Sequence, residues 1–185
     1  GEGDLICSDG LNHASIIDGI RLSRAARHIY PHRDLAALEA GLAAHADAVL
    51  KMVVTDGVFS MEGDLAPLSE MADLADRHGA FLVVDESHAL GILGENGRGT
   101  AEHLGVGDRV RVQTGTLGKS LGGAMGGYVA GSRDLIEHLT QTSRPYIFSN
   151  ALPPAVVFVA LTALELIRED PSPRERLRES TAYFR

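Results

Sequence analysis

Hydrophobic and polar positions alternate in blocks along the chain, with short apolar runs separated by longer amphipathic stretches. The apolar runs have the length and composition of buried strands, and they lie at 5–9, 27–30, 50–56, 80–85, 111–115 and 126–132. Helical periodicity predicts helices at about 14–23, 34–46, 67–78, 133–142 and 154–168, with a charged helix from 172 onward. Strands that alternate with helices of this length indicate βαβ units. The expected fold class is therefore α/β, a mostly parallel sheet flanked by helices.

The two ends and the composition limit what the chain can be. It opens almost directly in a strand and finishes within a helix, so we expect a fragment of a longer protein. A formal net charge of -8 argues against non-specific nucleic-acid binding. No apolar run approaches the ~18 residues of a membrane helix, so no membrane association is expected. With a single cysteine, Cys7, and no signal-peptide layout at the start, the expected location is cytoplasmic.

Polar side chains follow three of the predicted strands, where an open α/β sheet binds its ligands. Asp85 ends the apolar strand 80–85, and His88 comes three residues later. Ser60 follows strand 50–56, and Lys119 lies in a glycine-rich segment after strand 111–115. Because the carboxyl ends of parallel strands share one edge, these four residues are expected to converge there.

Lys119 is the residue with the most chemical promise. A solvated surface lysine is the plain alternative, but Lys119 is the only lysine after Lys51 and has Gly118 and Gly122-Gly123 beside it. The letters GKS resemble the end of a P-loop, yet that motif needs a glycine where this chain has Gln113. What remains is a lysine in a tight turn, suited to forming a Schiff base.

Asp85 and His88 each allow a structural and a functional interpretation. An aspartate that ends a strand is often a turn or cap residue. It also suits a cationic partner such as the pyridinium nitrogen of pyridoxal phosphate (PLP). His88 alone could be a structural histidine. The histidines show neither HExxH nor CxxC spacing, so no metal site is expected.

Five segments together resemble a known family, the α-oxoamine synthases. They are SDGLNHASIIDGIRLS (8–23), TDGVFSMEGDLAPL (55–68), VDESHALGILGENGRG (84–99), TGTLGKSLGGAMGGY (114–128) and SRPYIFSNALPP (143–154). The resemblance covers nearly the whole chain in the same order. It implies the fold type I architecture of PLP-dependent transferases. Residues 1–150 would form the PLP-binding large domain, incomplete at its N-terminus, and 151–185 a connecting helix and the start of the small C-terminal domain.

The resemblance also implies roles for individual residues. Lys119 would form the Schiff base with PLP, Asp85 would bind the pyridinium nitrogen, and His88 the phenolic oxygen. His13 would stack on the ring and assist substrate chemistry, although from the sequence alone His13 and Ser60 look structural. The family forms homodimers with the active site at the interface. Ser149 and Asn150 match a pair of residues that the partner subunit donates to this site. The remaining cofactor contacts would be Ser60, Thr116, Ser149 and Asn150.

Within the family, three short segments favour glycine C-acetyltransferase. They are TDG (55–57), DESHALG (85–91) and FSNAL (148–152). The expected reaction condenses glycine with acetyl-CoA to 2-amino-3-oxobutanoate and CoA, in threonine degradation. The alternative is 8-amino-7-oxononanoate synthase, which joins alanine to a pimeloyl thioester with loss of CO2. A non-catalytic PLP-fold scaffold subunit is the alternative of another class. We expect the isolated 185-residue chain to be inactive.

Overall fold

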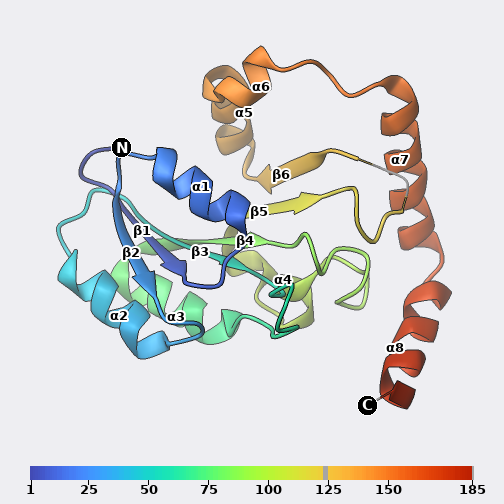
Figure 1. Cartoon of the computed structure of the whole chain (residues 1–185), viewed down its shortest axis with the longest axis horizontal. Coiled ribbons are helices and arrows are strands. Elements are labelled where there is room, and N and C mark those ends of the chain that lie inside the picture. The colour runs from blue at the N-terminus through green and yellow to red at the C-terminus, as the bar shows by residue number, and fades with distance from the viewer. Residues whose placement is uncertain (123–124, 185) are drawn as a thin grey trace.

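The computed structural model describes residues 1–122 and 125–184, and it shows one six-stranded sheet with helices on both faces (Figure 1). The strand order is β2-β1-β3-β4-β5-β6. All neighbouring strands pair in parallel except β5 and β6, which are antiparallel. This confirms the predicted α/β class with a mostly parallel sheet. The strands are β1 (Leu5–Asp9), β2 (Ala26–Tyr30), β3 (Lys51–Asp56), β4 (Ala80–Asp85), β5 (Val110–Thr116) and β6 (Gly127–Gly131).

Helices cover the two faces of the sheet unequally. Helix α1 lies on one face and helices α2 and α3 on the other, whereas α5 and α6 lie beside β6 (Figure 1). The helices α1 to α3 and α5 agree with the predicted ranges to within a few residues, and Asp34 caps α2 by accepting a hydrogen bond from the Ala37 N–H at 2.9 Å. The helices are α1 (Ala14–Leu22), α2 (Leu35–Ala44), α3 (Leu68–His78), α4 (Thr100–His103), α5 (Arg133–Thr142), α6 (Arg144–Phe148), α7 (Pro154–Glu169) and α8 (Ser172–Phe184).

The apolar side chains of the strands divide between two cores. One cluster joins Val53, Leu82 and Val84 to the buried faces of α2 and α3. The other joins Val54 and Val83 to Ile20 of α1. Because side chains alternate along a strand, the residues two positions after Val54 and Val83 also belong to the α1 face. These residues are Asp56 and Asp85, so the sheet's alternation places both carboxylates on the α1 side of its carboxyl edge.

Three short elements were not predicted: α4, α6 and a 3-10 turn at Gly107–Arg109. Each has five residues or fewer, which is too short for helical periodicity to show. Helix α6 lies in the segment SRPYIFSN and has Pro145 in its first turn, where a missing N–H costs nothing.

The two C-terminal helices run past the β5–β6 side of the sheet (Figure 1). Helix α7 packs Ala160, Ala163 and Ile167 against the segment that contains Leu121, and its other apolar side chains include the exposed Phe158. Among the helices that the structure describes, none has both the length and the apolar composition needed to span a bilayer. The predicted domain boundary at residue 150 stays a prediction.

Candidate functional site

Lys119 lies in the turn that follows β5, at the edge of the sheet where the parallel strands end. The turn is closed by hydrogen bonds from the Leu117 N–H to the Gly126 carbonyl at 2.9 Å and from the Gly122 N–H to the Lys119 carbonyl at 3.1 Å. Gly122 has a φ of 40°, in the left-handed region that favours glycine. Gly123, which the sequence also placed beside Lys119, lies outside the described residues. The Lys119 side chain is exposed and therefore open to a ligand.

Asp85 at the end of β4 is held by two donors. Its Oδ2 accepts a hydrogen bond from the Thr114 hydroxyl at 2.7 Å, and its Oδ1 accepts one from the Ser87 N–H at 2.9 Å. Thr114 is its register partner on β5, so both side chains leave the same face at the same level. These bonds fix the orientation of a half-buried carboxylate. Thr114 was not singled out from the sequence, because its importance depends on the pairing of β4 with β5.

His88 presents an unsatisfied ring nitrogen near Lys119. Its Nδ1 is buried and has no hydrogen-bond partner among the described residues. Partial burial lowers the pKa of His88, and the positive charge of Lys119 lowers that pKa further, while Asp85 acts in the opposite direction. The ring is therefore kept neutral at neutral pH, with a nitrogen left for a ligand. Lys119 follows β5 and His88 follows the adjacent strand β4, so both residues lie beyond neighbouring strands at the same edge of the sheet.

Asp56 at the end of β3 is a fourth member of this site that the sequence analysis did not identify. Burial, together with a smaller effect of the charge of Asp85, raises its pKa to about 6 against the lowering effect of a hydrogen bond from the His13 N–H. The charges of His13 and Lys119 oppose that rise. Asp56 is the register partner of Asp85 and accepts the His13 N–H, so these three residues lie together at the carboxyl edge of the sheet.

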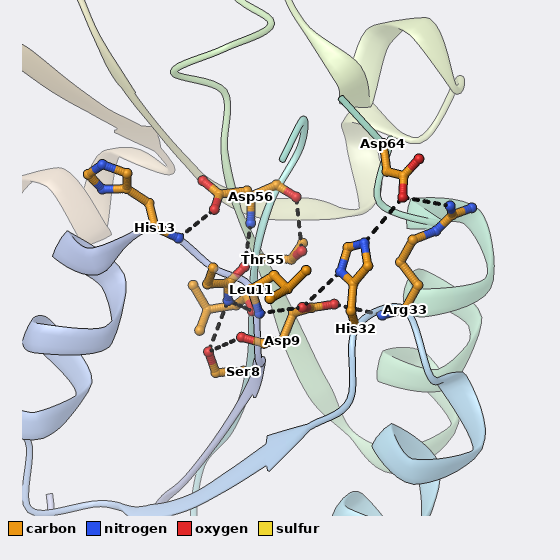
Figure 2. Close-up of polar contacts among 11 residues, drawn as sticks. Ser8, Asp9, Leu11, His13, His32, Arg33, Thr55, Asp56 and Asp64 are labelled. Carbon is orange, nitrogen blue, oxygen red and sulfur yellow. Dashed lines mark hydrogen bonds and ion pairs between the residues drawn. The ribbon is translucent and has the colours of Figure 1, made fainter. Parts of the chain in front are cut away.

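His13 occupies the N-terminal cap of α1. Its Nδ1 accepts a hydrogen bond from the Ser15 N–H at 3.2 Å, and its backbone N–H donates to Asp56 Oδ2 at 2.6 Å (Figure 2). The Asp56 N–H in turn donates to Asn12 Oδ1 at 2.8 Å, and Asn12 Nδ2 donates to the Val54 carbonyl at 2.9 Å. The turn that carries His13 is therefore fastened to β3, while the imidazole ring stays exposed.

The other expected cofactor contacts are placed in different ways. Thr116 shapes the turn of Lys119, since its Oγ1 donates to the Gly126 carbonyl and accepts from the Gly118 N–H, both at 3.2 Å. Ser60 is exposed on the loop after β3, at the same edge of the sheet. Ser149 and Asn150 are exposed after α6, and in the part of the chain that the structure describes no hydrogen bond joins them to Lys119, Asp85 or His88.

These groups fit the polar atoms of PLP. A carboxylate of fixed orientation suits the protonated ring nitrogen, a buried nitrogen without a partner suits the ring hydroxyl oxygen, and an accessible amine suits the aldehyde. A cavity of about 550 Å3 adjoins Asp85 and Thr114, between the β5–β6 pair and α5. Lys119 and His88 do not line this cavity, so it extends the site beyond Asp85 and does not contain the lysine.

Known proteins of one family resemble this chain along nearly its whole length. The family model "Aminotransferase class I and II" matches residues 1–185. An 8-amino-7-oxononanoate synthase of Anaeromyxobacter dehalogenans (strain 2CP-C) is 58% identical over 177 residues, which are 96% of this chain and 44% of the relative. The 8-amino-7-oxononanoate synthase 1 of Bacillus subtilis (strain 168) is 48% identical over 182 residues, 98% of this chain and 46% of the relative. The chain thus spans a little under half the length of these relatives.

Solved structures give the same result for the fold. A serine palmitoyltransferase from S. paucimobilis with a bound PLP–myriocin aldimine superposes with a TM-score of 0.92 at 37% identity, covering 97% of this chain and 46% of that one. An 8-amino-7-oxononanoate synthase from Francisella tularensis has a TM-score of 0.82 at 34% identity, covering 98% of this chain and 52% of that one. These matches confirm the fold type I architecture. This chain covers about half the length of each of these two structures.

Proposed function

Because the chain belongs to the aminotransferase class I and II family, whose cofactor is PLP, we propose that it is the cofactor-binding half of an α-oxoamine synthase. Such an enzyme joins an amino acid to an acyl thioester. The observation that supports this most strongly is the grouping at one edge of the sheet. Lys119 follows β5, and the adjacent strand β4 ends in the oriented carboxylate of Asp85. His88 follows β4, and its buried Nδ1 has no hydrogen-bond partner among the described residues.

When bound, PLP supplies an electron-withdrawing ring that stabilises negative charge on the amino-acid Cα. The Lys119 Nζ would hold the cofactor through its aldehyde carbon and, once displaced by the substrate amine, would take the proton from Cα. Asp85 would keep the ring nitrogen protonated, with Thr114 and the Ser87 N–H holding its two oxygens in place. Neutral His88 would contact the ring hydroxyl. His13 would lie over the ring face, where its position is set by Asp56.

For the substrates, we propose alanine and a pimeloyl thioester, with release of CO2 and the thiol. The relatives named 8-amino-7-oxononanoate synthase support this, at up to 58% identity in the comparisons above. They favour the alternative drawn from the sequence over glycine and acetyl-CoA, and they give no support to a role in threonine degradation.

Two residues in the segments that favour glycine C-acetyltransferase accept hydrogen bonds from backbone N–H groups in the structure. Asp56 of the TDG segment accepts the His13 N–H, and Glu86 of DESHALG accepts the N–H groups of Thr100 and Ala101 at 2.7 and 2.9 Å. Both carboxylates hold backbone, and neither contact depends on the acyl donor. The identity of these residues is therefore weak evidence about the substrate.

Substrate profiling of the full-length protein tests the proposal. Alanine, glycine and serine are each offered with pimeloyl-, acetyl- and palmitoyl-CoA, and both thiol and CO2 release are measured. We expect alanine with pimeloyl-CoA to exceed glycine with acetyl-CoA at least about tenfold in kcat/KM, because a carboxylate-tipped acyl chain needs its own contacts. A higher kcat/KM for glycine with acetyl-CoA, without release of CO2, would instead support glycine C-acetyltransferase. If the protein neither binds PLP nor forms any product, the non-catalytic scaffold subunit is the interpretation that remains.

We further propose that the enzyme is a homodimer and that Ser149 and Asn150 serve the partner's cofactor site. Both are exposed and separate from the Lys119 group, which supports a role outside this subunit's own site. In mixed dimers, a Lys119→Ala subunit is paired with a Ser149→Ala, Asn150→Ala subunit. The site that keeps Lys119 then receives the native Ser149 and Asn150 from its partner, so we expect one site of native PLP affinity in each mixed dimer. If that site binds PLP as weakly as the sites of the Ser149→Ala, Asn150→Ala homodimer, the two residues act within their own subunit and the proposal is wrong.

A further inference from the structure

A second polar cluster lies on the α2–α3 face of the sheet, around His32 in the loop between β2 and α2 (Figure 2). His32 Nδ1 is 3.1 Å from Asp9 Oδ1, and its Nε2 is 3.4 Å from Asp64 Oδ2. The ring also packs edge-on against the buried Phe59, with centroids 4.4 Å apart and an interplanar angle of 84°. His32 therefore contacts two segments that are far apart in the sequence.

Through Asp9, His32 is connected to the segment that carries His13. Asp9 is 2% exposed, and its Oδ1 also accepts a hydrogen bond from the Leu11 N–H at 2.9 Å. Its Oδ2 accepts one from the Arg33 N–H at 2.8 Å. Leu11 begins the short turn that leads through Asn12 to His13, so Asp9 sets the direction in which this turn leaves β1.

Through Asp64 and Phe59, His32 is connected to the loop that carries Ser60. This loop folds back on itself, because the Phe59 N–H donates to the Asp64 carbonyl at 3.0 Å and the Gly63 N–H to the Phe59 carbonyl at 2.9 Å. Ser60 lies between these two fastened positions. The Asp64 carboxylate faces outward to His32 and to the Arg33 guanidinium, 3.4 Å away.

The chemistry of the contacts suits a charged ring. Both nitrogens of His32 face carboxylate oxygens, which only accept hydrogen bonds. Both contacts can be hydrogen bonds at the same time only when both nitrogens carry a hydrogen, whereas a ring with one hydrogen donates to one carboxylate at a time. A glutamine amide in its place carries both of its N–H donors on one nitrogen and has an acceptor oxygen on the other side, so it cannot donate to the two carboxylates from opposite sides of a ring.

We propose that His32 is a positioning residue that holds the His13 turn and the Ser60 loop in one fixed relation across the sheet edge. It does so without touching the reacting atoms. The inference rests on the proposed function in one respect, namely that these two segments border the cofactor site. The contacts that His32 makes with the two segments are a property of the fold, so their effect on these segments can be measured without cofactor.

The test is amide hydrogen exchange on the full-length protein without PLP, followed by PLP titration monitored by absorbance. For His32→Gln we expect exchange to rise at least about tenfold in both 11–13 and 58–64, and the Kd for PLP to rise roughly five- to tenfold. His28→Gln is the matched control: His28 bonds the Ala37 carbonyl at 2.9 Å and reaches neither segment, so both should keep their protection.

A milder variant keeps the test decisive if His32→Gln fails to fold. Asp64→Asn weakens only the outer contact, so exchange should rise in 58–64. It should stay unchanged in 11–13, because His32 still holds the Asp9 carboxylate that accepts the Leu11 N–H. Release of only one segment by His32→Gln, or of both by His28→Gln, would overturn the proposal. If the native protein binds no PLP while both segments are released together, the proposed function fails and the positioning role stands. If the PLP affinity of His32→Gln is unchanged while both segments are released, His32 holds the two segments but does not support cofactor binding, and that part of the proposal is wrong.

Discussion

Asp56 and Asp85 are register partners at the ends of the adjacent strands β3 and β4, and the alternation of side chains places both carboxylates on the α1 face of the sheet. They differ in their partners. Asp85 is held by Thr114 and the Ser87 N–H, whereas Asp56 accepts the His13 N–H through one oxygen and its other oxygen is buried without a partner among the described residues. Burial, together with the charge of Asp85, raises the pKa of Asp56.

This raised pKa predicts a pH-dependent stability. Folded Asp56 keeps its proton to about pH 6, against 3.8 for an ordinary aspartate, so between these values the folded state binds more protons than the unfolded state. The contribution of Asp56 to the free energy of unfolding is therefore most favourable below about pH 4 and falls as the pH rises through 6. Asp56→Asn removes this term. Relative to the variant, the native protein should lose up to about 3 kcal/mol between pH 4 and pH 7.

Urea unfolding across this pH range measures the effect, with Asp47→Asn as the control. Asp47 is exposed in the turn after α2, so its substitution should leave the pH profile parallel to that of the native protein. Parallel profiles for Asp56→Asn as well would show that Asp56 titrates like an exposed carboxylate, contrary to its burial.

Thr114→Val tests whether the orientation of Asp85 matters. The substitution keeps the shape of the side chain and removes the hydroxyl that donates to Asp85 Oδ2 at 2.7 Å. A hydrogen bond to a charged group contributes about 1.5 kcal/mol or more, so kcat of the full-length enzyme should fall roughly tenfold or more with little change in the KM for the thioester. Thr142→Val removes a hydroxyl that bonds only within α5 and should leave both constants unchanged. A change in KM alone would contradict the assignment.

Arg174→Met tests the attachment of α8. Arg174 is buried, and its guanidinium donates to the carbonyls of Ile167 at 2.6 Å and Glu95 at 3.1 Å. Loss of these donors leaves partly buried carbonyls without partners, which should destabilise the chain by about 2 kcal/mol in urea unfolding. Among the described residues, the exposed Arg176 donates a hydrogen bond only to the Ser172 hydroxyl, at 2.9 Å, so Arg176→Met should change stability by less than about 0.5 kcal/mol. Equal effects of the two substitutions would count against this account.

Local patterns were enough to predict most of the fold. The apolar run at 80–85 became β4 within the same bounds, and Asp34 caps α2 as expected, because both depend on residues that are close in sequence. Helix α6 was missed because one turn and a half has no periodicity to detect. The antiparallel direction of β6 was not predicted either, since it depends on how the glycine-rich segment returns to β5.

The candidate site was predictable where chemistry follows strand ends and unpredictable where it depends on pairing. Lys119, Asp85 and His88 each follow an apolar run, and the structure brings them to one edge. The importance of Thr114 and Asp56 comes from their register with Asp85, which no single segment reveals. The preference for acetyl-CoA failed to gain support for a related reason: Asp56 and Glu86 bind backbone N–H groups, and the sequence does not show what a carboxylate contacts.

The most direct test of the account is to identify the amine that binds PLP. The full-length protein is loaded with PLP, reduced with borohydride and digested, and the pyridoxyl label is located by mass spectrometry. This chain contains only two lysines, Lys51 and Lys119, so each serves as the reference for the other. We predict stoichiometric label on Lys119, loss of the absorbance near 420 nm on reduction, and no label on Lys51, whose Nζ bonds the Ala46 carbonyl at 3.0 Å. An unlabelled Lys119 in a protein that binds PLP elsewhere would contradict it.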